Sequence, residues 1–445
     1  MAKNKRKCRP LCFILKAVFV LLGVVVLVLG GYIGYVSLSY YRIGDTSLQV
    51  LNNQTAKLSV ADIGTKEFKI TTYNVGFGAY DRDYSFFMDT SVFKDEYIHS
   101  QGNKSNTGDR ARGTSKAQVL RNINGAYDTI AALGDLDFML YQEVDTSSTK
   151  SYKVNQYEIG NKKHADYATI YGINYHSAYL MYPLHEPIGK SNSGISTYSK
   201  YHIAKAERRE FEITDAFFGK FFDLDRAFTI SEIPIEGSVK KLYVFNVHMS
   251  AYDKGGVIRK VQLEQLKAAI RVARDYDGDN NYVVVGGDFN HDLVLDNPLV
   301  NEEYKANIFN KQETEILEAN WYNYFRLDSG KHGTRVPNII TGLEEDYTHD
   351  FYDMALSSHG PVNIATCRDA SIKFIDKNNN GIVDNAMVTI DGFLVSDNIA
   401  VTEIKTIGSG HDLQKENLPE SDPRHGLGFV YSDHNPVLMS FKLQA

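Results

Sequence analysis

The chain has 445 residues, of which 43% are hydrophobic and 23% charged, so most of it should fold into a globular body. Its formal net charge is −7, and residues 1–36 hold six of the 48 basic residues and no acidic one. The remaining 42 basic residues face 55 acidic ones, a formal charge of about −13. This balance excludes nucleic-acid binding through non-specific attraction to a basic surface, so a polyanionic substrate would need a local positive feature such as a metal ion.

An uninterrupted apolar run, AVFVLLGVVVLVLGGYIGYV at residues 17–36, follows a basic tail at residues 1–16. A helix of this length rises about 1.5 Å per residue and spans the roughly 30 Å hydrocarbon core of a bilayer. The run is longer than the apolar core of a signal peptide and has a poor cleavage site after it, which favours an uncleaved transmembrane helix. Because the early positive charges precede it, we expect a single-pass protein of the cell membrane with a cytoplasmic N-terminus and the rest extracytoplasmic.

Residues 37–66 are polar and are predicted to form a stalk or linker, and residues 67–445 to form one domain. Within the domain, short runs typical of strands recur, several of them apolar throughout, as expected for strands buried on both faces. The runs are residues 67–75, 136–144, 193–201, 227–235, 241–249, 281–289, 351–358, 389–396 and 436–443.

Two amphipathic helices are predicted, at residues 115–133 and 258–274, because apolar residues recur there at spacings of three and four. The first helix is expected to bury Leu120, Ile123 and Tyr127. Each helix stands between two strand-like runs, and this order repeated twice indicates right-handed crossovers in an α/β layered domain.

Polar residues that bind metals or protons stand at or just after the ends of these runs. They are Asn74, Glu143, Asp145, Asn246, His248, Asp288, Asn290, Asp391, Asp433 and His434. Strand ends of one sheet meet where ligands of open α/β sheets usually lie. Carboxylate and amide oxygens suit Mg²⁺, and histidines exchange protons near neutral pH. No cysteine stands among these strand ends, and neither a G-x-S-x-G nor a G-x-x-x-x-G-K-[ST] motif occurs, so the pattern predicts metal-assisted attack of water on a phosphoester.

The segments TTYNVG, LYQEVD, FNVHM, VVVGGDFN, IDGFLVS and SDHNPV resemble, in order and approximate spacing, the motifs of the endonuclease/exonuclease/phosphatase superfamily, which has the deoxyribonuclease-I-like fold. The resemblance runs from about Phe68 to Leu443. It implies an α/β four-layer sandwich of two packed mixed β-sheets with helices outside. It also implies a Mg²⁺-dependent hydrolase acting on ester bonds, with Mn²⁺ as the alternative ion.

The resemblance assigns roles to the strand-end residues. Asn74, Glu143 and Asp433 resemble the metal ligands of the family. Asp288 and Asn290 resemble the pair that positions the attacking water and contacts the scissile phosphate. The two glycines before Asp288 are expected to leave room for phosphate close to the backbone.

The two histidines of the resemblance differ in their expected roles. His248 resembles the histidine that binds phosphate or donates a proton. His434 resembles the catalytic histidine, with Asp391 as its orienting carboxylate, although Asp353 in FYDMALSS competes for that role. The run 291–292 (His-Asp), just beyond Asn290, is expected to be loop.

Three substrate classes stay open: nucleic acid, a membrane phospholipid as in sphingomyelinase-type members, and a small phosphate ester. The segment FFGKFF, residues 217–222, would favour lipid if it were exposed, but two strand ends around a turn are the favoured interpretation. Residues 376–384 match the start of a Ca²⁺ loop, yet Met387 replaces the bidentate glutamate, so a hairpin turn is favoured. A catalytically inactive binding module is disfavoured because competent residues fill the expected positions, and Cys367 is expected to be a small buried residue.

Overall fold

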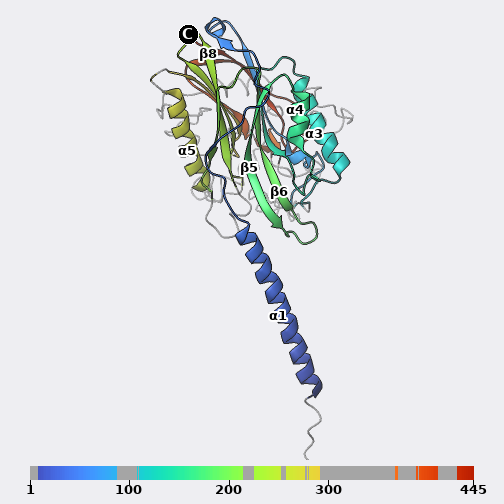
Figure 1. Cartoon of the computed structure of the whole chain (residues 1–445). Helices are drawn as coiled ribbons and strands as arrows, with labels where there is room; N and C mark the ends of the chain where they lie inside the picture. The colour runs from blue at the N-terminus through green and yellow to red at the C-terminus, as the bar shows by residue number, and fades with distance from the viewer. Residues whose placement is uncertain are drawn as a thin grey trace, which may run out of the picture.

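Helix α1 (Arg9–Leu38) projects from a body of two packed β-sheets with helices on the outside (Figure 1). The structure is a computed structural model of the chain. It describes residues 9–87, 108, 110–213, 225–251, 257–275, 278, 280–290, 366–368, 387–388, 390–408 and 428–445.

Sheet A is one of the two large sheets, and its strands run in the order β1-β7-β8-β9-β10-β13, with β2 paired to β8. The pairs β9–β10 and β2–β8 are parallel and the others antiparallel. Its strands are β1 (Thr46–Ser47), β2 (Leu58–Ser59), β7 (Lys205–Glu210), β8 (Ala227–Glu236), β9 (Lys241–His248), β10 (Tyr282–Asp288) and β13 (Asp391–Val395).

Sheet B has the order β14-β15-β3-β4-β6-β5, in which only the neighbours β3 and β4 are parallel. Its strands are β3 (Phe68–Asn74), β4 (Phe138–Asp145), β5 (Ala168–Leu180), β6 (Gly189–Ser199), β14 (Ile399–Thr406) and β15 (Val437–Leu443). A separate pair consists of β11 (Cys367–Arg368) and β12 (Met387–Val388).

The alternating residues of β10 explain the layers. Tyr282 and Val284 face the core between the sheets, where they join Leu140 of β4. Val283 and Val285 face the other way and pack under α5 (Val257–Arg274). A strand that is apolar on both sides must be covered on both sides, which is why its sequence reads as a continuous hydrophobic run.

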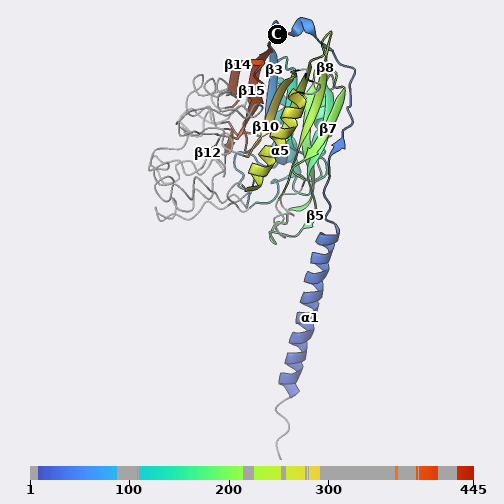
Figure 2. The ribbon, with the colours of Figure 1, turned by 90° about the vertical axis from the view of Figure 1, so that its left-hand side faces the viewer.

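Helices cover the outer face of each sheet (Figures 1 and 2). On sheet A, α5 buries Leu263, Leu266 and Ile270. On sheet B, α3 (Lys116–Ala131) packs beside α4 (Gln156–Lys163), and the predicted α/β four-layer sandwich with two mixed sheets is confirmed. The predicted face of α3 was wrong in one position: Leu120 is 36% exposed, because the adjacent Val119 takes the buried place.

The segment predicted as a stalk belongs largely to the body. Thr46 and Ser47 pair with β7, and Leu58 is fully buried between the sheets. The polar composition of residues 37–66 was misleading because β1 (Thr46–Ser47) is exposed and is held by its backbone pairing with β7 rather than by buried side chains. The structured body therefore begins well before Phe68.

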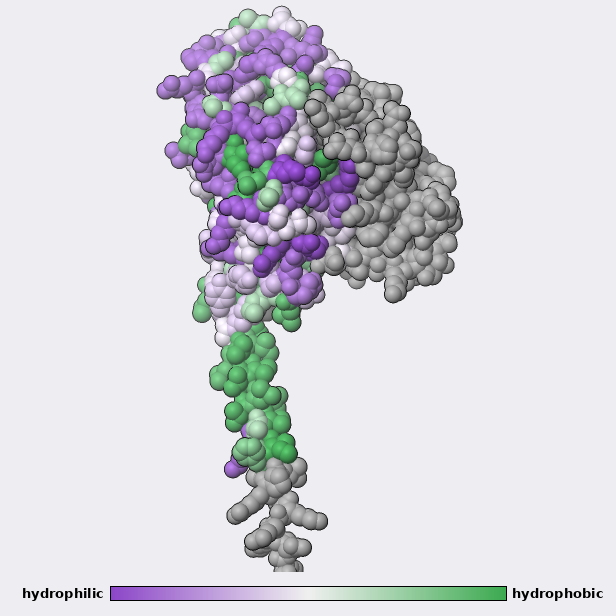
Figure 3. Space-filling model, turned by 90° about the vertical axis from the view of Figure 1, so that its right-hand side faces the viewer, coloured by the Kyte–Doolittle hydropathy of each residue, from purple (hydrophilic) through white to green (hydrophobic). Residues whose placement is uncertain are grey.

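Within α1, residues Phe13–Leu38 form a continuous helix with mean hydropathy 2.9, long and apolar enough to cross a membrane. In Figure 3 hydrophobic side chains cover this helix along its length, while the body surface in that view is mostly hydrophilic. Its apolar side chains are exposed, as in Leu27 at 76%, so α1 is not a core helix of the body.

Candidate active site

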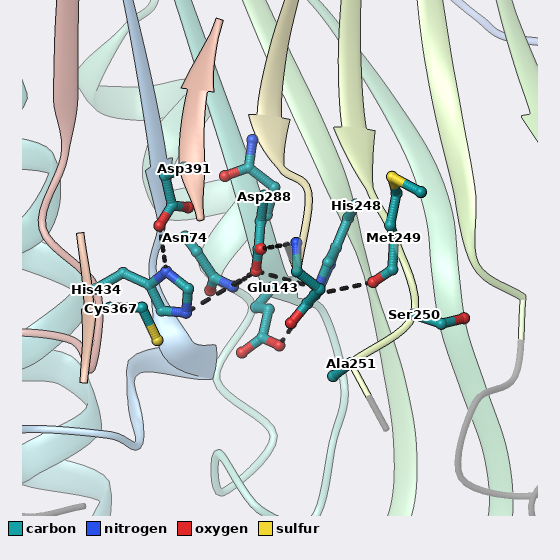
Figure 4. A network of polar contacts seen from close by, with 12 residues as sticks. Asn74, Glu143, His248, Met249, Ser250, Ala251, Asp288, Cys367, Asp391 and His434 are labelled. Atoms are coloured by element: carbon teal, nitrogen blue, oxygen red, sulfur yellow. Dashed lines mark hydrogen bonds and ion pairs between the residues drawn. The ribbon is translucent and has the colours of Figure 1, made fainter. Parts of the chain in front are cut away.

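Four strands that end side by side build the site. Asn74 ends β3, Glu143 lies two residues before the end of β4, His248 ends β9 and Asp288 ends β10 (Figure 4). The parallel pairs β3–β4 and β9–β10 bring these ends together from the two sheets. A hydrogen bond from Asn74 Nδ2 to Asp288 Oδ2 (2.9 Å) joins the sheets at this point.

The two glycines before Asp288 serve packing rather than phosphate access, so that expectation was wrong. A Cβ atom on Gly286 would lie 2.6 Å from the Phe393 ring and 2.7 Å from Leu140 in the core. Gly287 has φ +150°, and a Cβ there would lie 2.0 Å from the Val247 carbonyl oxygen. The glycines allow β10 to lie against β9 and the opposite sheet, and they thereby fix where Asp288 emerges.

Asp288 is the centre of the polar network. Its Oδ1 accepts the backbone N–H of Asn290 (2.8 Å), and Asn290 Nδ2 donates to the Met249 carbonyl (2.9 Å). Its Oδ2 lies 3.5 Å from Nε2 of His248 and 3.9 Å from Nε2 of His434. One buried carboxylate thus faces two imidazoles and an amide, an arrangement suited to moving a proton.

Asp391 holds His434 in place. Asp391 Oδ2 lies 2.7 Å from Nδ1 of His434, and both side chains are buried. Although burial works against the charged imidazole, Asp391 raises the pKa of His434 well above its usual value. This bond leaves Nε2 of His434 directed at Asp288, and the competing Asp353 lies outside the described residues.

His248 is bound on both ring nitrogens. Asn174 Nδ2 lies 3.0 Å from its Nδ1, and Arg226 Nη1 contacts its Nε2. Burial first, and then the Arg226 guanidinium, lower the pKa of His248 well below its usual value. The imidazole of His248 is therefore neutral, and the positive charge beside it is that of the Arg226 guanidinium. Such a pair can bind an anionic group.

Glu143 and Asp433 form the acidic side of the site. Glu143 has φ +56° and stands at a bulge in the pairing of β4 with β6, which turns its side chain into the cavity. Burial and then Asp433 raise the pKa of Glu143 to about 8. Two carboxylates in this position fit a divalent cation, since its charge would offset both their repulsion and their burial.

A second acidic group also lies close enough to hold an ion, because one ligand atom each of Asp288, Asp391 and His434 lies within 4.8 Å of the others. The facing atoms of Asp391 and His434 are already joined by their hydrogen bond. An ion bound by both of these atoms would have to break that bond, so the hydrogen bond accounts for the closeness of Asp391 and His434.

A cavity of about 250 Å³ lies in front of these residues. It is lined by seven residues that the sequence predicted, namely Asn74, Glu143, His248, Asp288, Asn290, Asp433 and His434. Asp391 supports His434 from behind. The predicted loop residues 291–292, the segment 217–222 and the candidate Ca²⁺ loop at 376–384 lie outside the described residues.

Several cavity residues were missed by the sequence interpretation. Arg226 precedes β8, which runs antiparallel to β9, so its N-terminal end lies beside His248. Lys150 is buried with Nζ 3.6 Å from the centroid of the Phe77 ring. Of these residues, only Arg226 could have been found from the sequence. It stands just before a predicted strand, and the start of a strand lies beside the end of its antiparallel neighbour.

Cys367 differs from the small buried residue that was expected. It is partly exposed, forms an isolated bridge with His434 and lines the cavity. Burial of the sulfur raises the pKa of its thiol to about 12, so the group stays protonated near neutral pH. The structure therefore places a cysteine beside the strand ends, where the sequence interpretation expected none.

No protein-family model matches the chain, and no curated protein matches it. Among solved structures it is similar to ANGEL2, a 2',3'-cyclic phosphatase, in complex with adenosine-2',3'-vanadate (16% identity, TM-score 0.47, 91% of this chain and 100% of that chain). It is also similar to D. rerio TDP2 complexed with single strand DNA product (12%, 0.42, 85% and 99%). A third is the endonuclease/exonuclease/phosphatase from Bacteroides vulgatus (14%, 0.42, 85% and 100%). The family that the strand-end motifs resemble is thus among these structures.

Proposed function

We propose that this chain is a member of the endonuclease/exonuclease/phosphatase superfamily and acts as a metal-dependent phosphoesterase, with Mg²⁺ as the ion. The observation that carries the proposal is the convergence of Asp288, His248 and His434 with the Glu143–Asp433 pair around one cavity. Proton-transfer groups and a cation site at one place are what water attack on a phosphoester requires.

The substrate phosphate would lie between the basic and the amide side chains. Arg226 and His248 present a buried, hydrogen-bonding pair on one side, and Asn290 projects beside them. A guanidinium binds phosphate oxygens well because its N–H groups are fixed in a plane. Because the body as a whole is acidic, this local positive group is what would select an anion.

Asn74, Glu143 and Asp433 would hold the metal ion. Bound there, the ion would supply charge that stabilises the phosphate as negative charge develops on its oxygens. Asn74 Nδ2 donates to Asp288, and its Oδ1 accepts the backbone N–H of Gly76 (3.0 Å), so the second lone pair of Oδ1 is what Asn74 would offer to a cation.

Asp288 would accept a proton from the attacking water as the water oxygen bonds to phosphorus. The bond from phosphorus to the leaving oxygen breaks, and Nε2–H of His434 would donate a proton to that oxygen. Asp391 keeps the ring of His434 oriented through the 2.7 Å bond to Nδ1. Each step uses an atom that faces the cavity or a direct partner of that atom.

We further propose that α1 anchors the chain in the cell membrane with the catalytic body extracytoplasmic. The support is the exposed apolar surface of Phe13–Leu38 and the six positive charges before residue 17. External protease added to intact cells should degrade the body and leave a protected N-terminal fragment. A body that survives until the cells are lysed would reverse this orientation.

The test of the activity uses the full-length chain in detergent micelles with bis-p-nitrophenyl phosphate. We expect turnover with Mg²⁺, loss of turnover with EDTA, and recovery on adding Mg²⁺ back. Asp288→Asn should lower turnover roughly 10³-fold, while the exposed Asp135→Asn serves as the matched control. Binding of the diester without hydrolysis under all these conditions would instead identify an inactive binding module.

A further inference from the structure

The tip of the hairpin that joins β5 to β6 exposes large apolar side chains at the end of the body where α1 attaches. We define the hairpin tip as residues 179–184; within it, Tyr179, Met181, Tyr182 and Leu184 are 39%, 47%, 59% and 82% exposed. Figures 1 and 2 both place the end of β5 beside the end of α1. Contiguous exposed apolar side chains on a loop mark a surface that meets another apolar phase.

The hairpin tip is bonded directly to α1. Tyr32 Oη accepts the backbone N–H of Met181 (2.8 Å) and lies 3.3 Å from the carbonyl oxygen of Tyr179. Tyr35 Oη accepts the backbone N–H of Tyr179 (3.2 Å). The hairpin tip is therefore held at the level of the last two turns of α1.

That level is the membrane interface if α1 spans the bilayer. Tyr32 and Tyr35 lie within the apolar segment Phe13–Leu38, near its end on the side of the body. Tyrosine rings favour this depth because one end of the ring is apolar and the other end forms hydrogen bonds. The hairpin tip is hydrogen-bonded to these two side chains and must therefore lie at the same depth in the membrane.

The candidate active site lies at the same end of the body. The C-terminus, which follows β15, is at the end remote from α1 in Figures 1 and 2. Because β3 is antiparallel to β15, the end of β3 that carries Asn74 points toward α1. Val36 of α1 belongs to the same buried apolar cluster as Phe77, Tyr80 and Phe86, which line the cavity.

We propose that the hairpin tip inserts into the headgroup layer and that the cavity takes as substrate the headgroup phosphoester of a membrane lipid. This inference rests on the proposed phosphoesterase activity and on α1 as a membrane span. Lipid phosphates lie at the interface where α1 ends, and one apolar cluster links that end of α1 to the cavity wall. A nucleic acid would instead approach a body that carries about −13.

The first test uses the full-length chain in vesicles of phosphatidylcholine, phosphatidylglycerol and sphingomyelin, with Mg²⁺. Release of water-soluble phosphate compounds is measured beside hydrolysis of bis-p-nitrophenyl phosphate by the same vesicles. The test variant is Met181→Ser/Leu184→Ser. The control is Val239→Ser/Val272→Ser, which changes two exposed valines (72% and 65%) away from the hairpin tip.

We expect the hairpin variant to lose lipid hydrolysis roughly tenfold and to keep hydrolysis of the soluble diester, because two apolar side chains leave the interface while the cavity is unchanged. The control should keep both activities. Soluble-diester hydrolysis without any release from the vesicles would overturn the lipid inference and leave the phosphoesterase proposal standing. Absence of both activities would overturn the phosphoesterase proposal itself.

The second test measures depth and does not depend on activity. The chain has a single tryptophan, so Trp321→Phe provides a background for Leu184→Trp and, as the control, Val239→Trp. In vesicles that contain brominated phosphatidylcholine, the fluorescence of the Leu184→Trp protein should be quenched and that of the Val239→Trp protein should not. Equal fluorescence of the Leu184→Trp protein with and without bromine would overturn insertion of the hairpin tip.

Discussion

The two strand–helix–strand units of the body are built alike, yet they bring different chemistry to the cavity. The first unit (β3, α3, β4) supplies Asn74 and Glu143, and the second unit (β9, α5, β10) supplies His248 and Asp288. In both, a parallel strand pair lies under one amphipathic helix. The first unit supplies the candidate cation ligands, and the second the groups that exchange protons or bind phosphate. The same local architecture can thus carry either role, because only the residues at the strand ends differ.

The largest expected effect is the fall in kcat when the second unit loses Asp288, the proposed proton acceptor. Asp288→Asn keeps the shape of the side chain but removes its basicity, so kcat for bis-p-nitrophenyl phosphate should fall roughly 10³-fold. Added Mg²⁺ should not restore it. Steady-state kinetics over a Mg²⁺ series would check this, and a variant that regains most of its kcat at high Mg²⁺ would place Asp288 among the ion's ligands instead.

The counterpart in the first unit is Glu143→Gln, which removes one negative charge from the predicted ion site. We expect the Mg²⁺ concentration for half-maximal activity to rise roughly 10- to 100-fold, with kcat largely recovered at saturation. The exposed Glu264→Gln is the control. If Glu143→Gln lost activity without any change in Mg²⁺ dependence, the division between the two units would be wrong.

A third prediction concerns the link between the units in the core. Gln142 Nε2 donates to Asn246 Oδ1 (2.7 Å), and both side chains are fully buried. Gln142→Leu leaves the Asn246 oxygen without this bond, so the free energy of unfolding should fall by about 1–3 kcal/mol. Urea unfolding of the full-length chain in micelles measures it. Additive losses from Gln142→Leu and Asn246→Leu in the double variant would show that the pair is not coupled.

The smallest effect is a pH dependence of stability beside the first unit, at His164 just after α4. His164 contacts the Tyr141 hydroxyl, and burial lowers its pKa to about 4. The unfolded chain binds a proton near pH 6.5 and the folded chain does not, so stability is complete above that value and declines below it. At about pH 5.5 the loss should be about 1 kcal/mol, and His164→Gln should remove it. Urea unfolding at about pH 5.5 and at a pH well above 6.5 measures this loss. The same loss in the His164→Gln variant would contradict the prediction.

Much of the site could be predicted because its residues directly follow apolar runs that the local sequence identifies as buried strands. The valines of β10 indicate a strand buried on both faces, and Asp288 follows at once. Asn174 and Lys150 gave no such signal. Asn174 lies inside the long strand β5, and Lys150 lies in a turn after β4. Their places in the site depend on how the sheets pack, which a single local pattern does not contain.

The fold was predictable for a related reason, and its errors have physical causes. Strands in the middle of the sheets have continuous apolar runs, whereas β7 (KAERRE) is charged at five of its six positions and β5 is interrupted by polar residues, and both were missed. The segment that contains Thr46 and Leu58 was assigned to a stalk because its edge strands are only two residues long. Short edge strands are held by partners that are distant in sequence, so composition alone does not detect them.

Gly287 has a consequence for how tolerant this chain is of sequence change. Its Cα faces the backbone of Val247 so closely that no side chain can be accommodated, whatever its chemistry. A saturation library selected for activity would therefore retain only glycine at this position, as strictly as it retains aspartate at Asp288. Intolerance at neighbouring positions would then have two unrelated origins, one in the reaction and one in the contact between two backbones, and only the stability of the purified variants would tell them apart.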